Sequence, residues 1–444
     1  NDKTVIALSK KTSNSRFAND SYRRFIQMYG NVVMGVEGYH FEELIENYKL
    51  TKGVLLDTDL DADDWEGLIN DFKKVIKDQT KKEFPTNEEL NNRFPNKPIF
   101  LTRIDFHAAI VSNRALELAG INENTIVTGG VVEVKNATLT GLLVDKAIPM
   151  VSDILPKMNP EQMGLALMKA QEMCFAKGLT SVADAYMENE VVHLIDSMQQ
   201  SGELKMNIYG MLVPSEENRK EFLAVGPYVT NKLNIHAFKY FADGALGSRG
   251  AKLIDPYHDD LSNSGLSTLD SVAFLTDLKL MYDKGFQVNT HCICDRANRE
   301  VLNAYGKVLK GTNDRRWRIE HAQIMNPNDF ELFRMYTIIP SVQPTHATSD
   351  MPWAEERIGA ERMQHAYAYK HLLNANGILA LGTDFPIEDI DPLKTFYAAS
   401  VRKNAEGNPQ EGFQIDNALS REETLKGMTI WAAMANFEDT KRGS

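Results

Sequence analysis

The chain has 444 residues, of which 43% are hydrophobic and 25% are charged, and its formal net charge is −12. This composition is enough for a large apolar core, whereas an acidic chain without a basic stripe argues against nucleic acid as a partner. No apolar run approaches the roughly 18–20 residues of a membrane span, so we expect no membrane partner either.

The first third of the chain does not show a simple repeat of strands and helices. Residues 25–29 are a degenerate candidate for the first strand of a domain that covers residues 25–444. Residues 37–178 contain helix signals at 41–48 and 65–82, a strand signal at 98–105 and a Gly-rich turn at 128–130. We interpret residues 37–178 as a large subdomain that is inserted after the first strand.

From residue 160 onward, short β-rich runs alternate with helical patterns. The predicted strands are residues 179–184, 207–213, 235–241, 287–291, 318–321, 338–343 and 378–384, and the clearest predicted helices are 160–177, 271–284, 295–309 and 362–375. This alternation indicates parallel βαβ units. Together with residues 25–29 the strands number eight, which favours a closed α/β barrel of the (β/α)8 TIM type. No Gly-x-Gly-x-x-Gly follows a strand, which argues against a dinucleotide-binding fold.

Four predicted strands end in residues that could bind a metal. Lys239, His291, His321 and Asp384 close the segments HAFK, QVNTH, RIEH and LALGTD. Because the carboxyl ends of barrel strands meet on one face, these side chains can converge on one site. Imidazole and carboxylate are ordinary zinc ligands, and a carboxylate beside such a metal can serve as a base. A single such residue is more often structural, so only the joint pattern indicates a site.

Longer segments of the chain resemble a known family. KYFADGALGSRGA, RIEHAQI, SVQPTHATSDMPWAEERIG and LALGTDFPIE are similar to one branch of the amidohydrolase superfamily. That branch includes N-substituted formamide deformylase and proteins of the exoenzyme-regulatory type. The resemblance implies a barrel with one or two zinc ions that hydrolyses a C–N bond. It implies that Lys239 is the carbamylated lysine, that His291 and His321 are metal ligands, and that Asp384 is both ligand and general acid/base.

The same resemblance implies further residues of the pocket. Asp105 and His107, in RIDFHAAIVSN, match an Asp-Gly-His segment of the family, with Phe106 in place of the glycine. His346 is expected to contact a substrate oxyanion, or else to order its own loop. The remaining predicted substrate-binding residues are Arg249, Gln343, Asp350 and Trp353.

Two features of the family are not found in this chain. The His-x-His pair of the first strand aligns with Tyr29 and Asn31, and no two of the ten histidines are separated by one residue. We therefore expect zero or one metal ion, zinc or another divalent metal, per chain. The β-sandwich that flanks the barrel in the family is expected to be reduced or absent, with residues 1–24 as its remnant. The surface left uncovered favours a homodimer.

Three interpretations remain open. The protein is a working hydrolase of a small amide-type substrate with a reduced metal site, a pseudoenzyme that keeps the barrel as a binding or regulatory protein, or part of a longer biological chain. Lys239, His291, His321 and Asp384 favour the first, and Tyr29 and Asn31 favour the second. Three cysteines are too few for a disulfide framework, which favours a reducing, cytoplasmic compartment and leaves a removed leader open.

Overall fold

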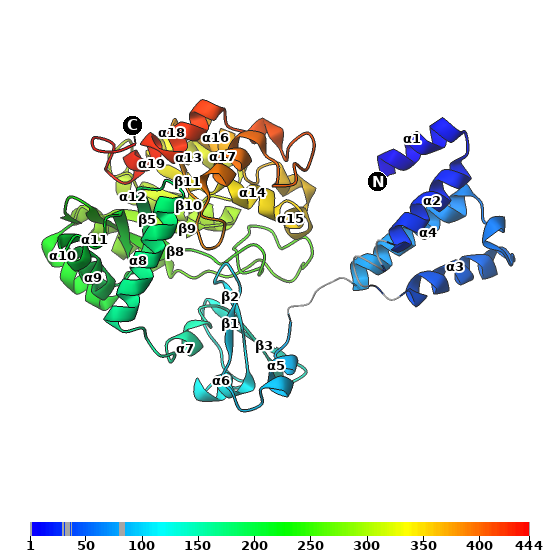
Figure 1. The fold of residues 1–444 in the computed structure, drawn as a ribbon, viewed down its shortest axis with the longest axis horizontal. Helices are drawn as coiled ribbons and strands as arrows, with labels where there is room; N and C mark the ends of the chain where they lie inside the picture. Colours follow the sequence, from blue (N-terminus) through cyan, green and yellow to red (C-terminus); the bar gives the residue numbers. More distant parts are fainter. Residues whose placement is uncertain (1, 29–30, 32–35, 37, 80–84, 444) are drawn as a thin grey trace. The chain divides into compact units, whose positions relative to one another are not determined.

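The computed structural model describes residues 2–28, 31, 36, 38–79 and 85–443 of the chain. It divides into two compact units, Asn1–Pro85 (unit 1) and Thr86–Ser444 (unit 2). In Figure 1, unit 1 is drawn in blue tones, and unit 2 runs from cyan to red. Each unit has a hydrophobic core of its own.

The described part of unit 1 is helical. Its elements are α1 Asp2–Thr12, α2 Ser15–Met28, α3 Tyr39–Lys52, η2 Asp57–Asp59 and α4 Ala62–Gln79. Phe41, Trp65 and Phe72 fill the core, and the rings of Phe41 and Phe72 meet edge to face with centroids 4.9 Å apart. The guanidinium of Arg23 lies 4.4 Å from the centre of the Trp65 ring. These contacts give the helices a shared apolar interior.

The helices of unit 1 correct two predictions. The strand at residues 25–29 is wrong, because residues 25–28 belong to α2, while Tyr29 lies outside the described residues. The segment 1–24 is also helical where it is described, not part of a sandwich. A short apolar run such as RFIQMY cannot be assigned to a strand or a helix from its periodicity alone. The alignment of Tyr29 and Asn31 with a first barrel strand therefore loses its structural basis.

Unit 2 begins with a small antiparallel sheet. Its strands are β1 Phe100–Thr102, β2 Ala108–Val111, β3 Gly130–Lys135 and β4 Thr138–Asp145, in the order β1-β2-β4-β3. Val111, Leu116, Leu143 and Val151 are buried in a separate apolar cluster under this sheet. In Figure 1 the turn between β1 and β2 points toward the larger sheet of the same unit.

The larger sheet is parallel and curled. Its strands are β5 Ser181–Met187, β6 Asn207–Leu212, β7 Tyr228–Val229, β8 Leu233–Phe241, β9 Gln287–Cys292, β10 Arg318–His321, β11 Ile339–Val342 and β12 Ala380–Leu381. They follow the order β12-β11-β10-β9-β8-β6-β5, and the short β7 pairs antiparallel with β8. The seven strands predicted after residue 178 are each confirmed by one of the parallel strands.

Helices connect the strands. In unit 2 they are α5 Glu88–Arg93, α6 Asn113–Leu118, α7 Pro149–Ser152, α8 Pro160–Ala176, α9 Asn189–Gln200, α10 Glu216–Val225, α11 Ser271–Asp283, α12 Asp295–Leu309, η3 Pro327–Asp329, α13 Phe330–Met335, α14 Pro344–Asp350, α15 Ala354–Met363, α16 Tyr369–Asn376, α17 Pro392–Val401, η4 Ile415–Asn417, α18 Arg421–Met428 and α19 Ile430–Ala435. None of the helices in the described residues combines the length and the apolar character that crossing a membrane needs.

The curled sheet is a half-barrel. β5 and β12 are its outermost strands, and within the described ranges no strand pairs with the outer edge of either. Ala183, Asp184, Ala185 and Tyr186 of β5 are exposed, which is unusual because parallel strands are normally covered on both faces. The chain is thus a mixed α/β protein whose parallel strands present their carboxyl ends on one side.

Candidate active site

The four predicted ligand residues lie on one side of the half-barrel. Lys239 is near the end of β8, His291 near the end of β9 and His321 at the end of β10, whereas Asp384 follows β12 by three residues. The parallel register places Phe241 beside His291, and Cys292 beside His321. The neighbouring strands β8, β9 and β10 therefore place Lys239, His291 and His321 at the same edge of the sheet.

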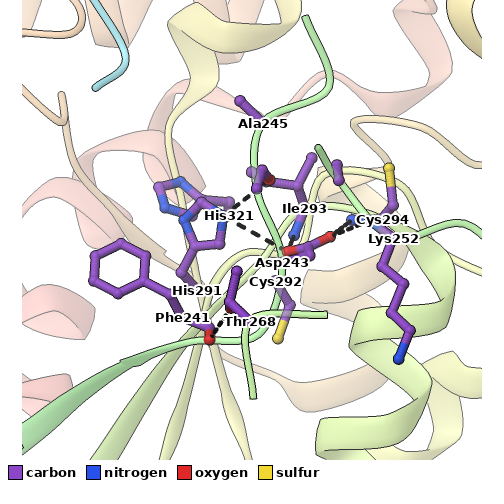
Figure 2. Close-up of polar contacts among 12 residues, drawn as sticks. Phe241, Asp243, Ala245, Lys252, Thr268, His291, Cys292, Ile293, Cys294 and His321 are labelled. Carbon is purple, nitrogen blue, oxygen red and sulfur yellow. Dashed lines mark hydrogen bonds and ion pairs between the residues drawn. The ribbon is translucent and has the colours of Figure 1, made fainter. Parts of the chain in front are cut away.

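The histidines form a row. The ring centroids of His107 and His291 are 4.9 Å apart, those of His291 and His321 are 4.7 Å apart, and those of His321 and His346 are 5.8 Å apart. His107 comes from the turn between β1 and β2, and His346 from α14. Four separate elements thus contribute one imidazole each, and Figure 2 shows His291 and His321 side by side.

Hydrogen bonds orient the rings. Nδ1 of His107 lies 2.7 Å from Oδ1 of Asp145, and Nδ1 of His321 lies 2.7 Å from Oε1 of Gln343. Because these oxygens only accept, both rings carry their proton on Nδ1 when neutral, and Nε2 keeps a free lone pair. Nε2 of His291 lies 3.2 Å from the carbonyl oxygen of Gly244. The backbone of His321 adopts φ +74°, a conformation that costs energy and is concentrated at functional sites.

The buried histidines stay neutral near physiological pH. Burial holds the pKa of both His291 and His321 well below the usual range, and the positive charge of neighbouring groups adds to this effect. Burial also lowers the pKa of His346 to about 4. Nε2 of His346 has no hydrogen-bond partner among the described residues and lies 3.8 Å from Oδ2 of Asp384. Neutral imidazole is the form that binds a metal.

Lys239 and Asp384 complete the electrostatics of the site. Burial lowers the pKa of Lys239, although the nearby carboxylates of Glu320 and Asp384 oppose this shift. Its Nζ lies 4.4 Å from the centre of the Phe241 ring. The Asp384 side chain keeps 38% of its surface accessible. Nevertheless, lost hydration raises its pKa to about 6 against the lowering effect of Lys239. Asp384 can therefore gain or lose a proton near neutral pH.

Asp243 is a buried member of the site that the sequence reasoning missed. Its carboxylate accepts hydrogen bonds from the backbone N–H groups of Lys252 at 2.9 Å, Ile293 at 2.9 Å and Cys294 at 3.0 Å. Oδ1 lies 3.6 Å from Nε2 of His291, and Figure 2 shows this network. Burial raises its pKa to about 7 against these hydrogen bonds. Its position directly after β8, in FADGA, was the available signal.

The predicted substrate-binding residues fall into two groups. In the first group, His107 belongs to the histidine row and Gln343 bonds to His321. Asp105 lies in the same turn as His107. Its carboxylate pairs with Arg103 and accepts a 3.1 Å hydrogen bond from the backbone N–H of His107. The other predicted residues, Arg249, Asp350 and Trp353, have partners of their own in the described residues.

Arg249, Trp353 and Asp350 are engaged away from the histidine row. Arg249 donates two hydrogen bonds to the carboxylate of Asp259, at 3.2 and 2.8 Å. The centre of the Trp353 ring lies 5.9 Å from the guanidinium carbon of Arg357, which pairs with the same aspartate. Oδ2 of Asp350 accepts bonds from Gln323 at 2.7 Å and from Tyr367 at 2.8 Å. These contacts order the loops around the site.

The residues present suit a divalent cation in kind. The neutral imidazoles and the carboxylate of Asp384 are the donors that zinc prefers, and Nε2 of His346 is buried without a hydrogen-bond partner among the described residues. Across the described ranges, however, no three His, Cys, Asp or Glu side chains already surround one point at ligand distance. The cysteines Cys174, Cys292 and Cys294 are free and buried.

Comparisons with known proteins find one family along most of the chain. A profile of the amidohydrolase family matches residues 42–444. Putative amidohydrolase YtcJ of Bacillus subtilis (strain 168) is 33% identical over 370 residues, 81% of this chain and 69% of YtcJ. Protein LONG AFTER FAR-RED 3 of Arabidopsis thaliana is 30% identical over 380 residues, 82% of this chain and 65% of that protein.

Two solved structures are similar to the chain in fold and in sequence. The uncharacterized metal-dependent hydrolases from Pyrococcus horikoshii OT3 and Pyrococcus furiosus are 27% and 26% identical, with TM-scores of 0.66 and 0.64. Both alignments cover 82% of this chain, and they cover 71% and 72% of the respective relatives.

A different protein also matches part of the chain. The pyruvate, phosphate dikinase of Entamoeba histolytica is 47% identical over 87 residues, which are 20% of this chain and 10% of the dikinase.

Proposed function

The chain belongs to the amidohydrolase family, and we propose that it is a metal-dependent hydrolase of a non-peptide C–N bond, of the amide or formamide type, in a small molecule. The observation that carries this proposal is the row of neutral imidazoles beside Lys239 and Asp384 at the carboxyl ends of the strands. The site thus holds both ligand-type nitrogens and a carboxylate that titrates near neutrality.

The proposed cofactor is zinc or another divalent metal, with zero or one ion per chain, held by Lys239, His291, His321 and Asp384. When bound, such an ion polarises a carbonyl group and lowers the pKa of water. Because burial favours the neutral amine of Lys239, this amine can add carbon dioxide, form a carbamate and release one proton. The carbamate then supplies the carboxylate oxygen that an ammonium lacks.

The protein groups have distinct proposed roles. Asp384 accepts a proton from the attacking water and passes it to the nitrogen of the leaving amine, because its pKa of about 6 allows both states. His346 can donate to the carbonyl oxygen as negative charge develops there. Its ring is already held beside His321, with its Nε2 unpaired among the described residues. Asp105, His107, Arg249, Gln343, Asp350 and Trp353 remain predictions as substrate contacts.

The experiment is metal analysis combined with an activity screen. The full chain is purified without chelators, and its metal content is measured before and after loading with zinc. Hydrolysis is then measured with N-formyl amines, N-acyl amines, cyclic amides and carbamates. We expect one or more of these amides to release its amine. Lys239→Met should remove metal retention and turnover, whereas Lys284→Met, at an exposed position, should change neither.

A negative screen would favour the other interpretation. If the zinc-treated protein retains no metal and hydrolyses none of these compounds, the hydrolase proposal fails, and a binding or regulatory role without catalysis replaces it.

The finer architecture also remains a proposal. A closed (β/α)8 barrel requires a strand between β5 and β12, and an experimental structure would detect it. The reduced sandwich and the interpretation of residues 37–178 as an inserted subdomain are predictions of the same kind. A homodimer is testable by light scattering, and the cytoplasmic location by cell fractionation.

A further inference from the structure

We propose that His107, carried by the small antiparallel sheet, is a third imidazole ligand of the metal beside His291 and His321, and that Asp145 is the residue that positions it. This inference rests on the proposed function, because it concerns the same metal. It makes His107 a metal ligand in place of the substrate contact predicted for it, in a part of the chain that the strand-end pattern does not include.

The spacing of the rings suits a shared cation. With zinc–nitrogen distances of about 2.0–2.1 Å and tetrahedral angles, the centroids of two imidazole ligands lie about 5 Å apart. The centroid of the His291 ring lies 4.9 Å from that of His107 and 4.7 Å from that of His321. His291 is thus the middle member of a set of three rings with suitable separations. The rings are inclined to one another by 37° and 71°.

The partner of His107 is the kind that metal-binding histidines have. A histidine ligand almost always donates its other N–H to a carboxylate or carbonyl, which fixes the tautomer and makes the donor nitrogen more basic. Nδ1 of His107 lies 2.7 Å from Oδ1 of Asp145, whose side chain is 3% exposed. The Nε2 lone pair of His107 is therefore left available. Gln343 orients His321 in the same way, through its Oε1.

The backbone holds this pair in place. Asp145 ends β4, and its N–H donates to the carbonyl oxygen of His107 at 3.1 Å. The antiparallel ladder between β2 and β4 continues up to this point, with Ala108 opposite Val144. His107 and Asp145 are thus neighbours across two paired strands, although 38 residues separate them in sequence.

The small sheet is fitted to the loop that follows β8. A Cβ atom on Gly244 or on Gly250 would lie only 2.3 Å from Oδ2 of Asp145. Hence only glycine at these two positions leaves room for the carboxylate. The same strand, β8, carries Lys239. This contact therefore fixes the position of the turn that carries His107 relative to the strand ends that carry the other proposed ligands.

Cobalt(II) binding to the full chain tests the proposal. Cobalt(II) is the probe, its visible absorption bands report the ligand geometry, and titration gives its affinity. We expect His107→Gln to weaken cobalt binding by at least 100-fold and Asp145→Asn by about 10- to 100-fold. The matched control is His193→Gln, because His193 also pairs with a carboxylate, Glu221, at 2.8 Å but is 64% exposed on α9. This control should bind cobalt as the unmodified chain does.

X-ray absorption of the zinc-loaded, unmodified chain gives a second measurement that needs no variant. Three imidazole ligands support the proposal, and two or fewer overturn it. If the unmodified chain and His107→Gln bind cobalt equally well, the role of His107 is disproved while the proposed metal site stands. If the unmodified chain binds neither metal, the proposed function and this inference both fail.

Discussion

Asp384 has the environment of a group that transfers protons. It adopts φ +58° after β12, and its carboxylate lies 3.8 Å from Nε2 of His346. Replacing it by asparagine keeps the shape and removes the base. We expect Asp384→Asn to lower turnover of any hydrolysed amide by about 10²- to 10⁴-fold, measured by steady-state kinetics with circular dichroism as the check on folding. Asp416→Asn, at an exposed position, is the control. Unchanged turnover would remove Asp384 from the mechanism.

Asp350 gives a prediction about pH. Burial raises its pKa to about 7, and the bonds from Tyr367 and Gln323 only partly oppose this. The folded pKa is above the unfolded value, so the unfolded chain loses this proton first as the pH rises. The stabilising contribution is therefore complete below about pH 4 and is lost by about pH 7. The loss of stability that Asp350 can cause is at most about 1.4 kcal/mol for each unit by which its folded pKa exceeds its unfolded pKa.

The variant Asp350→Asn cannot ionise and should reduce this dependence. We expect its free energy of unfolding, measured with urea, to fall less than that of the unmodified chain between about pH 4 and about pH 7. Asp416→Asn again serves as the control and should follow the unmodified chain. Parallel curves for the unmodified chain and Asp350→Asn would show that Asp350 is not the titrating group.

At the scale of elements, the small sheet packs closely against the loop after β8, with no space for an added methyl group at Gly250. Gly250→Ala places a methyl group against the buried carboxylate of Asp145. Such overpacking typically costs about 1–3 kcal/mol, which urea unfolding can measure. The control is Gly311→Ala, because no atom lies within 4 Å of the added Cβ. Equal stability of the two variants would mean that Asp145 moves aside freely.

The sequence predicts the strand β5 correctly but does not predict that it lies at the edge of the sheet. The run LTSVADAY indicates a strand by its composition, and β5 confirms it. Buried parallel strands are covered on both faces, yet Tyr186 is 51% exposed. A local pattern specifies the strand, whereas its neighbours decide whether it becomes a central or an edge strand.

For the whole molecule, the two separate cores predict two separable unfolding reactions. Phe72 is fully buried in the core of unit 1, and Phe238 is fully buried in that of unit 2. Each change to alanine should cost about 3–5 kcal/mol in its own unit. We expect Phe72→Ala to lower one transition in scanning calorimetry and Phe238→Ala to lower the other, so each variant is the control for the other. A single transition that both variants lower equally would contradict this division.

The sequence alone determined much of unit 2. Seven strands and the helices α8, α11 and α12 could be read from apolar runs that alternate with helical patterns, because these depend on neighbouring residues. The position of Lys239, His291 and His321 near the carboxyl ends of parallel strands followed from the same patterns, whereas their convergence with Asp384 on one metal stays a prediction. The same reasoning failed at residues 25–28, because a short apolar run is compatible with a helix such as α2 as well as with a strand.

Only the tertiary structure decided how the other groups meet. The pairing of His107 with Asp145, the glycine-lined space for that carboxylate, and the three backbone N–H groups around Asp243 join residues that no local pattern connects. The tertiary structure also decided how far burial shifts the pKa values of His346 and Asp384. The physical reason is that periodicity records which residues an element buries, whereas hydrogen bonds and hydration depend on what the fold brings against them.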